Sequence, residues 1–185
     1  SVIAAEGQDK DELLQLAATL EKGSEHPLAT AIVKGAEAKN IKLSNAQDFK
    51  SFTGKGVSGI INNKKVALGN DKLLVELNIK ETDLIKQADK LRESGETVML
   101  VALDGKLAGL IGVADPIKET TPQALKDLRK MGIRIVMLTG DNEKTAKAVA
   151  GKLEIDEIEA GVLPQRKSEI VKRLKEEGYI VAMAG

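Results

Sequence analysis

The chain lacks several residue types that would point to particular chemistry. It has no cysteine and a single histidine, so it has no disulfide and cannot assemble a soft-metal site from its own side chains. Its 28 basic and 28 acidic residues cancel, which leaves no one-sided field for capturing nucleic acid or an anionic membrane. The longest uncharged apolar run, 107–114, has about eight residues, well below the roughly 20 that a membrane-spanning helix needs. We therefore expect a soluble chain with no metal site and no nucleic-acid partner.

The first part of the chain mixes helix and hairpin patterns. Apolar residues recur at helical spacing over 9–22, 27–39 and 73–94. Apolar runs also flank Asn62–Asn63 and Asp104–Gly105, polar dipeptides that suit tight hairpin turns. These patterns predict a mixed α+β module over residues 8–112.

The second part alternates helix with short apolar strand. "IRIVML" (133–138) and "YIVAMAG" (179–185) are strand-like and are separated by helical patterns. Such alternation is typical of a parallel sheet covered by helices, with functional groups at the carboxyl ends of the strands. The predicted fold class is therefore α/β, with the mixed module followed by part of a doubly wound module formed by residues 1–7 and 113–185.

The segment "GKGVSG" (54–59) matches the G-x-G-x-x-G pattern of dinucleotide-binding turns. That turn must open a helix, whereas the residues after this segment read as strand, so a Rossmann turn is excluded. Two interpretations stay open: a loop whose missing side chains let the backbone approach a flat ligand, or a glycine-rich turn between strands. In the first case, a side chain at Gly56 should weaken ligand binding and leave the melting of the fold largely intact.

Two segments of the second module could hold phosphate. Thr139, Gly140 and Asp141 follow a predicted strand and precede a helix, where hydroxyl, carboxylate and amide groups suit a phosphate site; equally, the segment could be a turn in which Asp141 or Asn142 merely caps the helix. Lys167 falls in the first turn of a helix, where the dipole disfavours an exposed cation by about 0.3–1 kcal/mol unless an anion lies nearby. It could also be a solvated charge, like Arg166 beside it.

The lone histidine, His26, precedes a proline that is well suited to start a helix. Pro27 keeps His26 out of helical geometry, at the positive end of the helix dipole, where a neutral imidazole is favoured. Such a ring can stack on or hydrogen-bond a heterocycle, and Glu25 could accept a hydrogen bond from an exocyclic amine. The alternative is a half-buried packing histidine with Glu25 in solvent. Zinc binding is disfavoured because the chain offers no second soft ligand.

Taken together, these segments resemble one protein family. "SEHPLATAI", "TGKGVSG", "LGN", "ADPIKETT", "VMLTGDNEKTA" and "VLPQRKSEIVKRLK" occur in the order and approximate spacing of the heavy-metal-transporting P-type ATPases. The resemblance is strongest to the copper(I)-exporting subgroup and covers essentially the whole chain.

The resemblance implies that residues 8–112 form a nucleotide-binding domain. Glu25 and His26 would recognise adenine, and a backbone cradle would lie beside the nucleotide. The residues implied in that cradle and its pocket are Gly54, Gly56, Gly69 and Asn70.

Residues 1–7 and 113–185 would form most of a phosphorylation domain of the haloacid-dehalogenase type. Thr139, Gly140 and Asp141 would belong to its phosphate site, and Lys167 would hold the transferred phosphoryl group. Asp115 would lie near the hinge between the two domains.

Two family motifs have no counterpart here. The Asp-Lys-Thr-Gly-Thr run with the phosphorylated aspartate and the Asp-Gly-x-x-Asn-Asp run that coordinates magnesium are both absent. We therefore expect a cytoplasmic piece of an integral membrane pump that binds ATP, with most ligands of Mg2+ outside this chain. Its partner would be the rest of the pump, including a transmembrane domain that transports copper. A free-standing phosphohydrolase of the haloacid-dehalogenase type and a non-catalytic ATP-sensing module remain alternatives; the first needs an aspartate nucleophile that the amino-terminal residues do not offer.

Overall fold

The computed structural model describes residues 1–24, 27–80, 83–114 and 117–184. It divides the chain into two compact units, Ser1–Asp115 and Pro116–Gly185.

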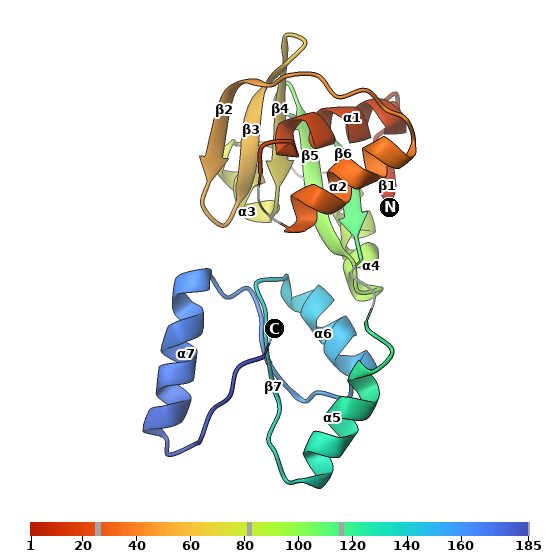
Figure 1. The fold of residues 1–185 in the computed structure, drawn as a ribbon. Helices are drawn as coiled ribbons and strands as arrows, with labels where there is room; N and C mark the ends of the chain where they lie inside the picture. Colours follow the sequence, from red (N-terminus) through yellow and green to blue (C-terminus); the bar gives the residue numbers. More distant parts are fainter. Residues whose placement is uncertain (25–26, 81–82, 115–116, 185) are drawn as a thin grey trace. The chain divides into compact units, whose positions relative to one another are not determined.

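The first unit is built on a six-stranded antiparallel sheet with the strand order β1-β6-β5-β4-β3-β2 (Figure 1). Helices α1 and α2 cover one face, and α3 and α4 cover the other. The strands are β1 (Val2–Ala4), β2 (Gln47–Phe52), β3 (Gly56–Ile61), β4 (Lys64–Gly69), β5 (Thr97–Leu103) and β6 (Lys106–Val113). The helices are α1 (Lys10–Glu21), α2 (Pro27–Ala38), α3 (Asp71–Glu76) and α4 (Leu84–Glu93).

Strand β5 shows why the sheet is buried on both faces. Successive side chains of a strand point to opposite faces. Val101 and Leu103 pack into the core under α1 and α2, whereas Leu100 and Ala102 pack into the core under α3 and α4. An almost continuous apolar run is therefore the sequence expected of this strand.

The predicted hairpins are confirmed. Asn62 and Asn63, between β3 and β4, have φ of 50° and 63°. Asp104 and Gly105, between β5 and β6, have φ of 47° and 79°. Two consecutive positive φ values are what a two-residue hairpin turn requires, and asparagine, aspartate and glycine tolerate them best.

The single helix predicted over 73–94 is wrong, because the chain forms α3 and α4 instead. Asn78 has φ of 53°, which ends the helical path, and the Ile79 amide donates to the Leu74 carbonyl. This turn places Ile79, only 7% exposed, in the core. Burial of one apolar residue thus outweighs the helical periodicity.

Residues 1–7 were expected with the second module, but the structure places them in the first unit. Strand β1 pairs with β6, with Ile3 opposite Leu110, and the Gly112 amide donates to the Ser1 carbonyl at 2.9 Å. This extra strand satisfies the outer edge of β6, which would otherwise have unpaired backbone groups.

The second unit contains two parallel strands and three helices. They are β7 (Val136–Leu138), β8 (Glu157–Glu159), α5 (Thr121–Lys130), α6 (Glu143–Lys152) and α7 (Pro164–Glu176). The strand predicted over 179–185 is absent from its described part, 179–184, where Ile180 is fully exposed. A strand requires hydrogen bonds from a neighbour, and none of these residues pairs with β7 or β8. The α/β class is confirmed.

Candidate functional site

The predicted glycine loop is the turn between β2 and β3. Residues 53–55 form the turn, and the Lys55 amide donates to the Phe52 carbonyl at 2.9 Å. Gly54 occupies the left-handed region, with φ of 69°. The Phe52–Lys55 bond makes Gly54 the third residue of a β-turn, where a positive φ favours glycine, so the local conformation alone accounts for Gly54.

Gly56 and Gly69 face each other in register between β3 and β4. A Cβ added at Gly56 would lie 2.2 Å from the Leu68 carbonyl oxygen, and one at Gly69 would lie 2.2 Å from the Lys55 carbonyl oxygen. The chain's own backbone therefore fills the space that a side chain would need. The expectation that a side chain at Gly56 leaves the fold intact is contradicted by this geometry.

Asn70 ties the elements of this cluster together. Its Nδ2 donates to the Gly54 carbonyl at 2.8 Å, and its backbone amide donates to the Lys55 carbonyl at 2.8 Å. Its Oδ1 accepts a hydrogen bond from the Lys72 amide and caps α3. One side chain thus links the β2–β3 turn to the start of α3. The structure brings Gly54, Gly56, Gly69 and Asn70 together, and we call these four residues the glycine cluster.

Sequence reasoning missed the role of the Lys55 backbone in this cluster. The Lys55 carbonyl accepts from Asn70, while its side chain pairs with Glu76 of α3. No residue-type signal marks a carbonyl acceptor, so only the register of β3 against β4 could have revealed it.

Glu25, His26 and Asp115 lie outside the described residues. Helix α2 begins at Pro27, directly after His26, as the sequence predicts. In Figure 1, this end of α2 and the β2–β3 turn lie at the same end of the six-stranded sheet.

In the second unit, Thr139 and Asp141 lie together just beyond β7. The Thr139 hydroxyl donates to Asp141 Oδ2 at 2.8 Å and accepts from the Asp141 amide at 3.1 Å. Asn142, rather than Asp141, caps α6, because its Oδ1 accepts from the Lys144 amide. The predicted cap is therefore confirmed at Asn142 and does not account for Asp141; Gly140, between Thr139 and Asp141, is exposed.

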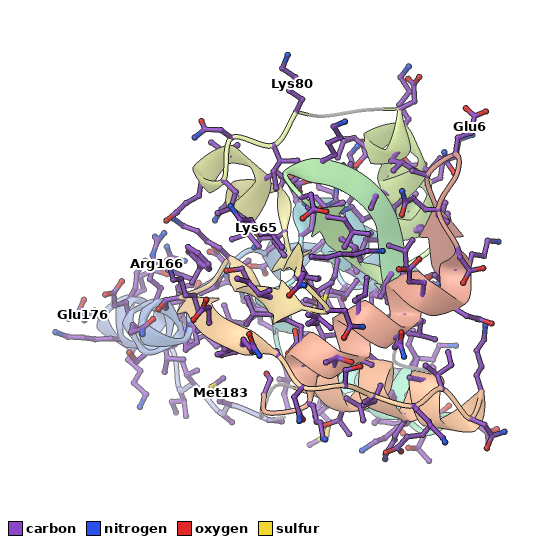
Figure 2. The ribbon with its side chains drawn as sticks, turned by 90° about the horizontal axis from the view of Figure 1, so that it is seen from above. Glu6, Lys65, Lys80, Arg166, Glu176 and Met183 are labelled. Carbon is purple, nitrogen blue, oxygen red and sulfur yellow. The ribbon has the colours of Figure 1, made fainter. Side chains whose placement is uncertain are left out.

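Lys167 lies in the first turn of α7, on the chain that leaves β8. The Val162 amide donates to the Thr139 carbonyl at 3.0 Å, and α7 starts two residues later at Pro164. Topology thus puts the start of α7 at the carboxyl ends of both strands. Arg166 and Glu176 project outward from this helix (Figure 2), and Arg166 approaches Glu169 at 3.9 Å. Lys167 is half-buried and has no ion-pair partner within the described ranges.

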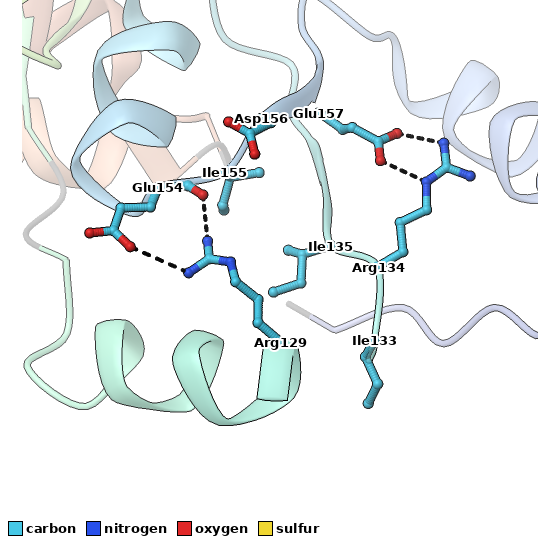
Figure 3. A pocket seen from close by; sticks show the side chains of 8 residues that line it. All are labelled: Arg129, Ile133, Arg134, Ile135, Glu154, Ile155, Asp156 and Glu157. Carbon is cyan, nitrogen blue, oxygen red and sulfur yellow. Dashed lines mark hydrogen bonds and ion pairs between the residues drawn. The ribbon is translucent and has the colours of Figure 1, made fainter. Parts of the chain in front are cut away.

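A cavity of about 210 Å³ lies at the other end of the parallel pair (Figure 3). Its charged groups satisfy one another. Arg129 donates to the carbonyls of Leu153 and Glu154, and Arg134 makes two hydrogen bonds to the Glu157 carboxylate. These bonds lower the pKa of Glu157 and raise the pKa of Arg134. Both arginines of the cavity are therefore held by other groups of its lining, and the cavity lies at the opposite end of the strand pair from Thr139, Asp141 and Lys167.

Two further observations concern the described residues only. No group of three or more histidine, aspartate or glutamate side chains is placed to hold a metal ion. No helix among them combines the length and apolar character needed to cross a bilayer.

Comparisons with known proteins agree with this architecture. The family model of the haloacid dehalogenase-like hydrolases matches residues 3–185. The silver-exporting P-type ATPase of Salmonella typhimurium is 50% identical over 100% of this chain, and the copper-transporting P-type ATPase of Rhizobium leguminosarum bv. viciae is 50% identical over 99%. The chain spans 22% of the length of each of these relatives.

Two solved structures match at the level of single domains. The N-domain of HMA8, a copper-transporting P-type ATPase, is 28% identical, with a TM-score of 0.53; the match covers 62% of this chain and 97% of that domain. The catalytic domain of the CPx-ATPase CopB-B, studied upon nucleotide binding, is 26% identical, with a TM-score of 0.64 over 96% of this chain and 62% of that one. These likenesses confirm the resemblance to heavy-metal-transporting P-type ATPases, and the chain belongs to the haloacid dehalogenase-like hydrolases.

Proposed function

We propose that this chain is the ATP-binding piece of a heavy-metal-transporting P-type ATPase, with copper(I) as the transported ion. Its first unit binds ATP, and its second unit contributes phosphate-site groups to a phosphorylation domain. The phosphorylated aspartate, most Mg2+ ligands and the membrane-spanning metal pathway lie elsewhere in a longer protein. The relatives' much greater length supports this arrangement.

The observation that carries the proposal is the glycine cluster. Gly54, Gly56, Gly69 and Asn70 come from two separate stretches of sequence and meet around one carbonyl, that of Lys55. The absence of side chains at Gly56 and Gly69 lets β3 and β4 cross closely, and Gly54 in the adjoining turn has no side chain to keep a base away from the backbone. Glu25 and His26 are proposed to complete the site through hydrogen bonds to the adenine.

The second unit is proposed to hold the transferred phosphoryl group. Thr139 and Asp141 supply a hydroxyl and a carboxylate beyond β7, and Lys167 supplies a positive charge from the first turn of α7. Phosphoryl transfer depends mainly on positioning and on neutralising charge, and Mg2+ would supply further positive charge when bound. Without the aspartate nucleophile, these residues alone do not form the covalent intermediate.

The exposed apolar surface of the second unit supports its being part of a larger domain. Helix α5, which is described throughout, buries none of its residues, and Leu128 and Met131 are 38% and 74% exposed. Ile180 and Met183 are also exposed. Apolar surface of this kind is usually covered by another part of the protein.

Calorimetric titration with ATP tests the proposal. Asn70→Ala should weaken binding, because it releases the Gly54 carbonyl and loosens the turn. Asn63→Ala, in the β3–β4 turn outside the glycine cluster, is the matched control and should bind as wild type does. If wild type does not bind ATP, or if both variants bind equally well, the proposed site is wrong.

A further inference from the structure

A buried arginine lies on the sheet face covered by α3 and α4. Arg92, on α4, is only 4% exposed. Its Nη2 donates to Asp71 Oδ2 at 2.8 Å, and its Nη1 donates to Asp89 Oδ1 at 3.1 Å. Its Nε is buried without a hydrogen-bond partner in the described part of the chain. Burying the guanidinium costs desolvation that offsets much of its attraction to the two partly exposed carboxylates, so stability alone is a poor account of this arrangement.

The two carboxylate partners of Arg92 differ in location. Asp89 lies on α4 itself, one turn before Arg92, so that pair stays within one helix. Asp71 is the first residue of α3, so the other pair fixes α3 to α4. Only the pair with Asp71 reaches toward the glycine cluster.

Asp71 directly follows Asn70, whose side chain holds the Gly54 carbonyl and caps α3. The direction of the Asn70 side chain depends on the position of the first turn of α3. That helix has only six residues and is too short to hold its own place without tertiary contacts. An ion pair that keeps Asp71 in place therefore also keeps the Asn70 Nδ2 group in position to donate to the Gly54 carbonyl in the β2–β3 turn.

We propose that Arg92 is a positioning residue for the nucleotide site, acting through Asp71 and Asn70 on the turn at Gly54. This inference rests on the proposed function. Arg92 does not touch the nucleotide; it keeps the glycine cluster in its binding-competent arrangement before the ligand arrives, so that binding does not have to order it.

Two variants of matched chemistry separate positioning from stability. Asp71→Asn and Asp89→Asn each remove one carboxylate charge from the same guanidinium and leave the other in place. Asp71→Asn should weaken ATP affinity roughly fivefold or more, the range expected for coupling through a neighbouring residue. Asp89→Asn should leave affinity near that of wild type, although both lower the unfolding midpoint.

A ligand-free measurement gives a second readout. The side-chain amide NMR signals of Asn70 report its hydrogen bond to Gly54. Asp71→Asn should shift these signals and speed their hydrogen exchange, and Asp89→Asn should not. Arg92→Met, which keeps the aliphatic length, should have the same effects on ATP affinity and on the Asn70 signals as Asp71→Asn. The double variant Arg92→Met/Asp71→Asn should bind ATP no worse than either single variant, because both substitutions break the same ion pair.

The possible outcomes separate a failure of the proposed role of Arg92 from a failure of the proposed ATP binding. If wild type binds ATP and the two aspartate variants bind equally well, or if Asp71→Asn leaves the Asn70 signals in place, the role of Arg92 is overturned while the proposed function stands. If wild type does not bind ATP, the proposed function fails, and the nucleotide role of Arg92 fails with it. Should Arg92→Met not fold, the two aspartate variants still decide the question.

Discussion

Gly56→Ala is predicted to destabilise the first unit strongly, whatever its effect on ligand binding. The new Cβ would lie 2.2 Å from the Leu68 carbonyl oxygen and 2.5 Å from the Gly69 Cα, and φ at this position is +146°. Overpacking typically costs about 1–3 kcal/mol, and an unfavourable backbone conformation costs roughly 1–3 kcal/mol more. The sum, on the order of 2–6 kcal/mol, should lower the melting temperature of the unit by about 10 °C or more.

Gly105→Ala is the matched control for this prediction. Gly105 also has positive φ, +79°, but a Cβ there would meet nothing within 4 Å. The control therefore measures conformational strain without the clash. Unfolding should be followed through NMR signals of β3 and β4 in the full chain, because two units need not melt together. If Gly56→Ala costs no more than Gly105→Ala, the close backbone crossing is refuted.

Three further outcomes are expected. Asn70→Asp keeps the cap on α3 but loses the donor to the Gly54 carbonyl. It should therefore destabilise the fold less than Asn70→Ala, in which loss of the cap costs about 1 kcal/mol. Urea unfolding compares the two variants. Lys167→Ala should leave ATP affinity unchanged, since that residue serves the phosphate site; a large loss in calorimetry would contradict the division of labour. The pKa of Glu157, followed by carboxyl NMR, should lie below the ordinary glutamate value, and Arg134→Gln should raise that pKa. The pair is exposed, so its contribution to stability is small. That contribution is present above the pKa of Glu157 in the unfolded chain and is lost as the pH falls through its pKa in the folded chain.

The Gly56 prediction also limits how a binding defect may be read. Loss of the β3–β4 crossing is by itself sufficient to abolish ATP binding in a Gly56 variant. The Asn70 and Asp71 variants are more informative, because they change side chains while leaving the backbone path available.

The sequence predicts the elements of this fold wherever one signal dominates. The hairpins at Asn62–Asn63 and Asp104–Gly105 depend on local backbone preference, and the structure confirms them. The start of α1 is equally local, since Asp9 accepts hydrogen bonds from the amides of Asp11 and Glu12.

Where tertiary contacts compete with local signals, the predictions fail. The 73–94 helix is interrupted because Ile79 is buried, and the segment 179–184 has the composition of a strand but no partner strand. Strand β2 was not predicted, because five of its six residues are exposed and give little apolar alternation.

In the candidate site, too, local sequence signals predict some features and tertiary contacts decide the others. The glycine pattern indicated Gly54 and Gly56, and the family resemblance implied Gly69 and Asn70, but neither explained why each residue is needed. The register of β3 against β4 shows that two of these glycines are required by the chain's own packing. Arg92 gave no signal in the sequence, because one arginine in a charged helix looks like any other.

The measurement that tests the central claim most directly is an NMR titration of the isotope-labelled chain with ATP in the absence of magnesium, with wild type compared against His26→Gln. The account predicts shifts at Glu25, His26, residues 54–59 and Asn70, weakened by the substitution. Shifts centred on Thr139 to Asp141 instead, or no shifts at millimolar ATP, would contradict nucleotide recognition by the first unit.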